Sequence, residues 1–224
     1  SDPYTGRDPR LSDNIFCNGS SANRGGQVTS PMYTFDMGRD GADVAGKEGT
    51  SASNYYIKKF IFEGYNPYDA VPQTQNRCVF VIRWTRMLLC YAEAANMAWG
   101  PLDAHLGLSA KDALAYIRSK SIPVDPYLDE CSASRESFAA LVKNEWRVET
   151  CFEGERFYNL RRWAADASEL NVPVYGASIN GAGYINTHHL LHTLSYPSLS
   201  MPIPYTEFRK TSSLTQNAGW ESWK

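Results

Sequence analysis

Residues 144–163 read NEWRVETCFEGERFYNLRRW and carry four Glu and four Arg among seven apolar or aromatic side chains. On a helix that turns about 100° per residue, one broad apolar face would hold Phe138, Leu141, Val142, Trp146, Val148, Phe152 and Leu160. Glu145, Glu149 and Arg156 fall near the middle of that face. A buried charge without a partner costs several kcal/mol, so charges at these positions must be paired. The segment therefore predicts an internal ion-pair network.

Glu149 is expected to be buried and bonded to an arginine; the candidates are Arg83, Arg86 and Arg156. An alternative follows from the spacing of Glu145 and Glu149, which lie one helical turn apart. Such a pair could serve as the two carboxylates of an α-helical glycoside hydrolase. Arginines lie close by in the sequence, and pairing with them keeps a carboxylate ionised and therefore poor as an acid. The pattern favours a structural network over catalysis.

Residues 77–163 carry the helical signals. An apolar repeat at intervals of three or four residues predicts a long helix ended by Gly100, with Trp84 and Tyr91 on its buried face. Ser109 followed by Asp112 resembles a capping box, and Ser134 with Ser137 introduces a further helix, in which Trp146 is expected to be buried. A long helix, a loop and an Ala-rich helix resemble a tetratricopeptide unit, although no second copy follows at a fixed period.

The two flanking regions have the composition of loops. Residues 1–76 are rich in Gly, Ser, Asn and Asp, with residues 54–62, NYYIKKFIF, as the best strand candidate. Residues 164–224 contain scattered Gly and Pro and are expected to form a loop-rich tail. The predicted fold class is mostly α, with a tetratricopeptide-like helical body, long ordered loops and a few short strands.

Four stretches in order resemble the SusD/RagB family. Residues 147–163 follow its signature Arg-x-Glu-x2-Phe-Glu-Gly-x-Arg-x3-Leu-x-Arg-Trp. Residues 4–11, YTGRDPRL, resemble the family's Asn-Arg-Asp-Pro-Arg segment, and residues 83–95, RWTRMLLCYAEAA, resemble one of its helices. PIPYTE at 202–207 and LTQNAGW at 214–220 resemble its terminal pattern. The departures from the family pattern are Gly6 for Asn, Trp84 for Tyr and Arg86 for Glu.

The resemblance implies a non-enzymatic binding protein on the cell surface. Members of the family are outer-membrane lipoproteins that capture an oligosaccharide or another nutrient and pass it to a SusC-like TonB-dependent transporter. Residues 1–224 would correspond to the carboxy-terminal region of such a protein, with the lipid anchor upstream. A further alternative is a tetratricopeptide-type module that only docks a protein partner.

Composition and motifs exclude several other classes. The formal net charge is −2 and the pI is near 6.1, which gives no sign of a nucleic-acid surface. No apolar run is long enough to cross a membrane. The chain has no phosphate-binding glycine motif and no nucleophile motif, so the sequence indicates no catalytic residue and no cofactor. Its five Cys include no C-x-x-C pair of the kind that binds zinc.

The His cluster and the loop aromatics are the remaining candidates. His188 and His192 are spaced as on a zinc-binding helix, but His189 stands where a zinc protease needs Glu, so a solvated cluster is favoured over a metal site. An aromatic ring can pack on the C–H face of a sugar while nearby polar side chains bind its hydroxyls. The predicted ligand-binding residues, all in loop regions, are Tyr33, Phe35, Tyr65 and Tyr68.

Overall fold

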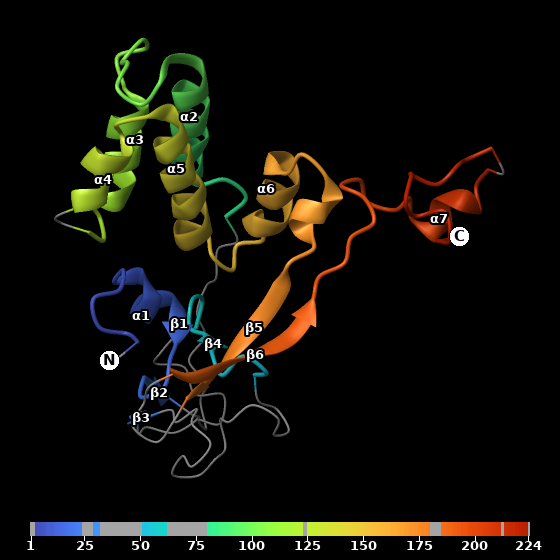
Figure 1. The fold of residues 1–224 in the computed structure, drawn as a ribbon, viewed down its shortest axis with the longest axis horizontal. Helices are drawn as coiled ribbons and strands as arrows, with labels where there is room; N and C mark the ends of the chain where they lie inside the picture. The colour runs from blue at the N-terminus through green and yellow to red at the C-terminus, as the bar shows by residue number, and fades with distance from the viewer. Residues whose placement is uncertain are drawn as a thin grey trace, which may run out of the picture.

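The computed structural model describes residues 3–23, 29–31, 51–61, 80–122, 125–179, 185–211 and 213–223. Its body is a bundle of helices α2 (Trp84–Trp99), α3 (Ala110–Arg118), α4 (Pro126–Cys131) and α5 (Arg135–Glu149). Figure 1 shows this bundle above the short helix α1 (Arg10–Asn14) and the strands, with α6 (Glu155–Trp163) beside it. The prediction of a mostly α-helical fold is confirmed.

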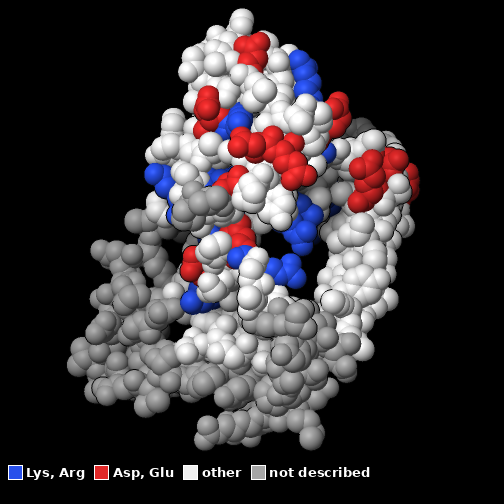
Figure 2. Space-filling view, turned by 60° about the vertical axis from the view of Figure 1, so that its left-hand side comes forward, with Lys and Arg blue, Asp and Glu red and all other residues white. Residues whose placement is uncertain are grey.

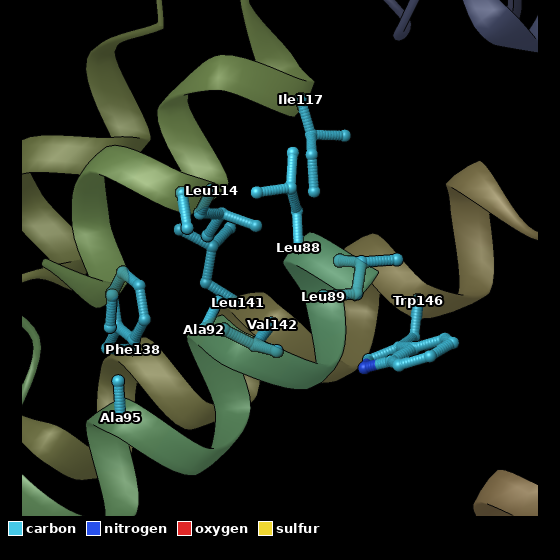
Figure 3. Close-up of a cluster of buried hydrophobic side chains, with 12 residues drawn as sticks. Leu88, Leu89, Ala92, Ala95, Leu114, Ile117, Phe138, Leu141, Val142 and Trp146 are labelled. Atoms are coloured by element: carbon cyan, nitrogen blue, oxygen red, sulfur yellow. The ribbon is translucent and has the colours of Figure 1, made fainter. Parts of the chain in front are cut away.

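The core of the bundle forms where α2 packs against α3 and α5. Leu89, Ala92, Leu114, Phe138 and Val142 have no solvent exposure, and Figure 3 shows them pointing toward one another from the three helices. Alanines on α2 and α3 let the helix axes approach, while the larger side chains fill the space between them. Trp146 is buried at the edge of the same cluster, as predicted.

The buried face of α2 differs from the predicted one. Trp84 is 66% exposed, and Tyr91 is only partly buried, with its hydroxyl donating to the Leu108 carbonyl. The residues that α2 buries are Leu88, Leu89, Ala92, Ala95 and Asn96. The predicted set and the observed set of buried residues both fit a helical repeat. Packing against α3 and α5 determines which set is buried. The prediction that Trp84 is buried is therefore wrong.

The predicted helix boundaries have the expected local causes. The Ser109 side chain accepts from the Asp112 N–H at 3.0 Å, and the Asp112 carboxylate accepts from the Ser109 N–H at 3.3 Å, which completes the capping box. The Ser134 hydroxyl accepts from the Ser137 N–H at 3.1 Å where α5 begins. Gly100 ends α2 with φ at 95°.

The single apolar face expected across residues 138–160 is broken after α5. Phe152 has φ at 64° and Gly154 has φ at 83°, so the chain leaves the helical path and restarts as α6 at Glu155. Phe152 is consequently 45% exposed, and Arg156 is exposed on α6 rather than central in a buried face. The expectation was wrong for these residues because it continued one helical period through a left-handed turn.

The amino-terminal region contributes small sheets. Strand β1 (Ile15–Phe16) pairs with β4 (Tyr56–Ile57), and β2 (Ser21–Asn23) pairs with β3 (Thr29–Pro31), both antiparallel. Within the predicted strand at 54–62, only the two residues of β4 are in a strand among those that the structure describes.

The longest strands lie in the carboxy-terminal region, where the sequence predicted loops. Strands β5 (Pro173–Ile179) and β6 (Ile185–Thr193) form an antiparallel hairpin. The Asn54 side chain, which is buried, donates to the Ala177 carbonyl at 2.7 Å, and His189 Nε2 bonds the Ala52 carbonyl at 3.1 Å. The hairpin is thereby bonded at Ala177 and His189 to residues 52–54.

After the 3₁₀ helix η1 (Ala167–Leu170) and the hairpin, the chain extends to one side and ends beyond α7 (Tyr205–Phe208), as Figure 1 shows. Gln216 holds this segment together. Its side-chain oxygen accepts from the Ile203 N–H at 2.7 Å, and its amide nitrogen donates to the carbonyls of Ile203 and Trp223 at 3.1 and 2.9 Å. None of the helices that the structure describes combines the length and apolar character needed to cross a membrane.

Candidate functional site

Glu145 on α5 is the centre of a buried ion-pair network. Its side chain has no solvent exposure, and both oxygens are bonded to arginines. Arg10 donates to Oε1 and, at 3.2 Å, to Oε2, while Arg118 on α3 donates to Oε2 at 2.8 Å. A carboxylate without water is tolerated only when its lone pairs are occupied in this way.

The residues just before α1 orient Arg10. Asp8 accepts from the Arg10 side chain at Nε (3.0 Å) and Nη2 (2.7 Å), and from its backbone N–H at 3.0 Å. This fork leaves Nη1 directed at Glu145 and at Glu149, which it reaches at 2.9 Å. Pro9 between the two residues fixes the local backbone angle. The Arg-Asp-Pro-Arg segment therefore supplies a positioned cation to α5.

The network continues toward the start of α2. Glu149 also accepts from Arg83 Nη1 at 2.9 Å, and Arg83 donates to Glu153 at 3.0 and 2.8 Å. Lys59 bonds the same Glu153 carboxylate at 2.7 Å. Five segments distant in sequence, including α3 through Arg118, are thus tied to one another by charged side chains.

The contacts of the network lower the pKa of three of its acids and raise the pKa of Arg10. Hydrogen bonds from Arg10 hold the pKa of Asp8 below its usual value, and those from Arg118 do the same for Asp125. Burial alone would raise the pKa of Glu153, but its bonds from Arg83 and Lys59 lower it. Burial alone would lower the pKa of Arg10, but its bonds to the three carboxylates raise it. All these groups are held in their charged forms.

A second cluster surrounds Glu93 on α2. Trp146 and Trp163 donate their indole N–H groups to its carboxylate at 3.1 and 2.8 Å, and Arg162 Nη2 donates at 2.6 Å. Burial raises the pKa of Glu93, yet the bonds from Arg162 and the two indoles outweigh this effect and lower it. These contacts hold α6 against α2. They give Arg162 and Trp163, which come after the break that ends α5, a structural role.

The predicted network is present, with corrections to its members. Glu149 is bonded to Arg83, as predicted, but its side chain is 18% exposed, and the fully buried acid is Glu145. Arg86 pairs instead with Glu155 at 3.0 Å. The sequence reasoning missed Arg10, although the Arg-Asp-Pro-Arg segment was a signal that could have found it.

Arg156 is not a partner of Glu149 among the contacts of the described residues. Partial desolvation of its guanidinium lowers its pKa, and the nearby charge of Arg147 lowers it further. Arg156 and Arg147 therefore lie in a positive local field that no acidic side chain of the described residues neutralises by a direct ion pair.

A pocket of about 500 Å³ lies against the outer side of this network. One part of its lining comes from residues 3–15 (the amino-terminal segment) and another from the last turns of α5, and Tyr55 also lines it. The lining side chains of the amino-terminal segment include Tyr4, Arg7, Asp8, Arg10, Leu11 and Ile15, and those of α5 and the following turn are Asn144, Arg147, Val148 and Cys151. Polar and apolar groups thus meet in a space suited to a small ligand.

The predicted ligand-binding residues Tyr33, Phe35, Tyr65 and Tyr68 lie outside the described residues. The His cluster lies on a strand rather than a helix, so His188 and His192 are about 13 Å apart along β6, too far to share a metal ion. His189 instead bonds Ser178 and the Ala52 carbonyl. In the described ranges, no group of three or more His, Cys, Asp or Glu is placed to hold a metal.

Comparison with known proteins identifies a family for this chain. The sequence model of the SusD family matches residues 1–220. A search of curated proteins finds no match. The family match spans nearly all of the 224 residues and includes every segment of the ion-pair network. The chain belongs to the SusD family.

Proposed function

We propose that this protein is a non-enzymatic nutrient-binding protein at the cell surface, which captures an oligosaccharide or a related nutrient and delivers it to a SusC-like TonB-dependent transporter. Its place would be the outer membrane, held there by a lipid anchor. The family match carries the proposal, because the SusD family is one of glycan binding and nutrient uptake.

The state of the signature carboxylates supports a binding role over a hydrolytic one. Glycoside hydrolysis needs two carboxyl groups that reach the scissile bond from opposite sides. Glu145 has no exposed surface and is held by Arg10 and Arg118, while Glu149 is held by Arg10 and Arg83. Neither is free to donate a proton to a leaving group. The ion pairs of Glu145 and Glu149 indicate that both residues stabilise the fold.

The pocket between the amino-terminal segment and α5 is the ligand site that we propose within the described residues. It contains tyrosines, an amide and arginines beside apolar side chains, the mixture that binds sugar rings and their hydroxyls. The loop aromatics Tyr33, Phe35, Tyr65 and Tyr68 remain a proposal for a further part of the ligand surface.

Calorimetry with a panel of oligosaccharides tests binding, and chromatography of the same samples tests for turnover. We expect saturable binding of at least one member of the panel and no hydrolysis products. Hydrolysis that disappears in Glu145→Gln while the variant stays folded would overturn the non-enzymatic role. Co-purification of the intact protein with an outer-membrane transporter tests delivery, and a native complex with no such transporter would contradict it.

A further inference from the structure

The pocket of about 500 Å³ has an uneven distribution of charge. Arg7, Arg10 and Arg147 line it, with Asp8 as the acidic residue among its lining side chains. Asp8 directs both oxygens at Arg10, and Arg10 in turn is bonded to Glu145 and Glu149 behind the pocket wall. Arg118 also bonds Glu145 and Arg83 also bonds Glu149, so all of these groups are engaged within the network. The charge that remains for a ligand is that of Arg7 and Arg147.

Arg7 and Arg147 have no carboxylate partner among the described residues. Arg7 donates through Nε to the Pro3 carbonyl at 3.0 Å, a bond that anchors the side chain without using its two terminal nitrogens. Both residues are exposed, and they line the pocket from different segments, Arg7 from the amino-terminal segment and Arg147 from α5. Figure 2 shows basic and acidic side chains at the edge of a hollow below the helical part.

The remaining lining fits a ring-shaped ligand that carries an anionic group. A guanidinium presents parallel N–H donors that match the two oxygens of a carboxylate or sulfate. Leu11 and Val148 offer apolar surface, Tyr55 offers an aromatic face, and Asn144 offers an amide for hydroxyl groups. The volume suits a ligand of one or a few sugar rings.

We propose that this pocket binds an acidic oligosaccharide, whose anionic group lies between Arg7 and Arg147 and whose ring packs on the apolar wall. This assignment rests on the proposed function and names the class of nutrient. Because the wall is built by the family's Arg-Asp-Pro-Arg segment and by α5, the ion-pair network that supports Arg10 also keeps the two walls together.

Titration calorimetry on the intact protein tests the charge preference. The probes are a trimer of galacturonic acid, a sulfated trisaccharide and a neutral maltotriose, each at low and at high salt. We expect an anionic trimer to bind at least tenfold more tightly than maltotriose, with a preference that falls as salt screens the charges. The tighter of the two anionic probes then assigns carboxylate or sulfate. Equal affinity for the charged and neutral trimers would overturn the proposal.

Arg7→Gln and Arg147→Gln test the two residues, with Arg209→Gln as the matched control because Arg209 is an exposed arginine remote from the pocket. Each pocket variant should lose about tenfold in affinity for the anionic trimer, as expected for one charge-assisted bond, and should keep its melting temperature. The control should bind like the wild type.

Two failures have different meanings. If the protein binds neutral sugars and neither variant changes its affinity for the anionic trimer, the acidic-ligand assignment is wrong while nutrient binding stands. If none of the panel binds in either experiment, both proposals are wrong.

Discussion

Two glutamates of this protein show that the place of a charge in the fold determines how much it contributes to stability. Glu145 and Glu149 are one turn apart on α5, yet Glu145 is sealed between Arg10 and Arg118, whereas Glu149 lies at the edge of the body beside Arg83. Removing one partner of a buried pair leaves an uncompensated charge, which is far more costly than losing an exposed pair. The two glutamates should therefore differ in their contribution to stability.

Glu145→Ala is expected to lower the free energy of unfolding by about 3–5 kcal/mol, because it leaves Arg10 and Arg118 without their shared carboxylate. Glu149→Ala should cost less, since water can reach the gap. Urea denaturation followed by circular dichroism measures both. Glu130→Ala is the control, an exposed glutamate on α4 with an expected change within about 0.5 kcal/mol. If Glu145→Ala is as mild as the control, the buried network does not stabilise the fold.

At the scale of elements, the β5–β6 hairpin depends on close packing against a loop. Gly176 faces His189 across the hairpin, and a Cβ at this position would lie 2.7 Å from His189 Nε2 and 2.9 Å from the Ala52 carbonyl oxygen. The absent side chain leaves room for the bond between His189 and Ala52. A glycine is thus needed here because another segment lies too close for a side chain, and not because of the backbone angle.

Gly176→Ala should destabilise the protein by about 1–3 kcal/mol, the range for overpacking of a tight contact. Adding His189→Ala should recover only part of this loss, because the Ala52 carbonyl would still be too close. Thermal unfolding of the wild type, both single variants and the double variant gives the coupling between the two positions. If Gly176→Ala melts like the wild type, residues 52–54 do not pack on the hairpin as described.

At the scale of the whole molecule, three of the four blocks that resemble the family pattern converge in space. The first block supplies Asp8 and Arg10, and the block at residues 83–95 supplies Arg83 and Glu93. The signature at residues 147–163 supplies Glu149, Glu153, Arg162 and Trp163. Ion pairs therefore join the amino-terminal segment, the bundle and α6. The family pattern in these blocks contains the partners of both the Glu145 network and the Glu93 cluster.

The ion pairs of the Glu145 network and of the Glu93 cluster predict that the folded protein loses stability in acid. Asp8, Glu93, Asp125 and Glu153 have pKa values lowered in the folded state, so the unfolded chain binds more protons as the pH falls through the ordinary range near 4. The stability that these groups contribute is complete above that range and is lost progressively below it. Urea midpoints at pH 7, 5, 4 and 3 should be similar at 7 and 5 and then fall. Midpoints that stay constant down to pH 3 would contradict the assignment of these pairs.

The helices and the family could be predicted from the sequence because both depend on local order. Capping at Ser109 and Ser134 involves residues three apart, and the helical repeat involves neighbours within one turn, so each is readable without the fold. The need for paired charges around Glu145 and Glu149 was also a local inference, from their place on an apolar face.

Tertiary structure alone decided which partners meet. Arg10 and Glu145 are separated by 135 positions, and no local pattern connects them. The exposure of Trp84, the left-handed turn before α6 and the β5–β6 hairpin likewise depend on what packs against each segment. Several faces of a helix can satisfy the same repeat, and a strand needs a partner to exist. The physical reason is that burial and strand pairing are properties of two surfaces in contact, whereas the sequence at any point describes only one of them.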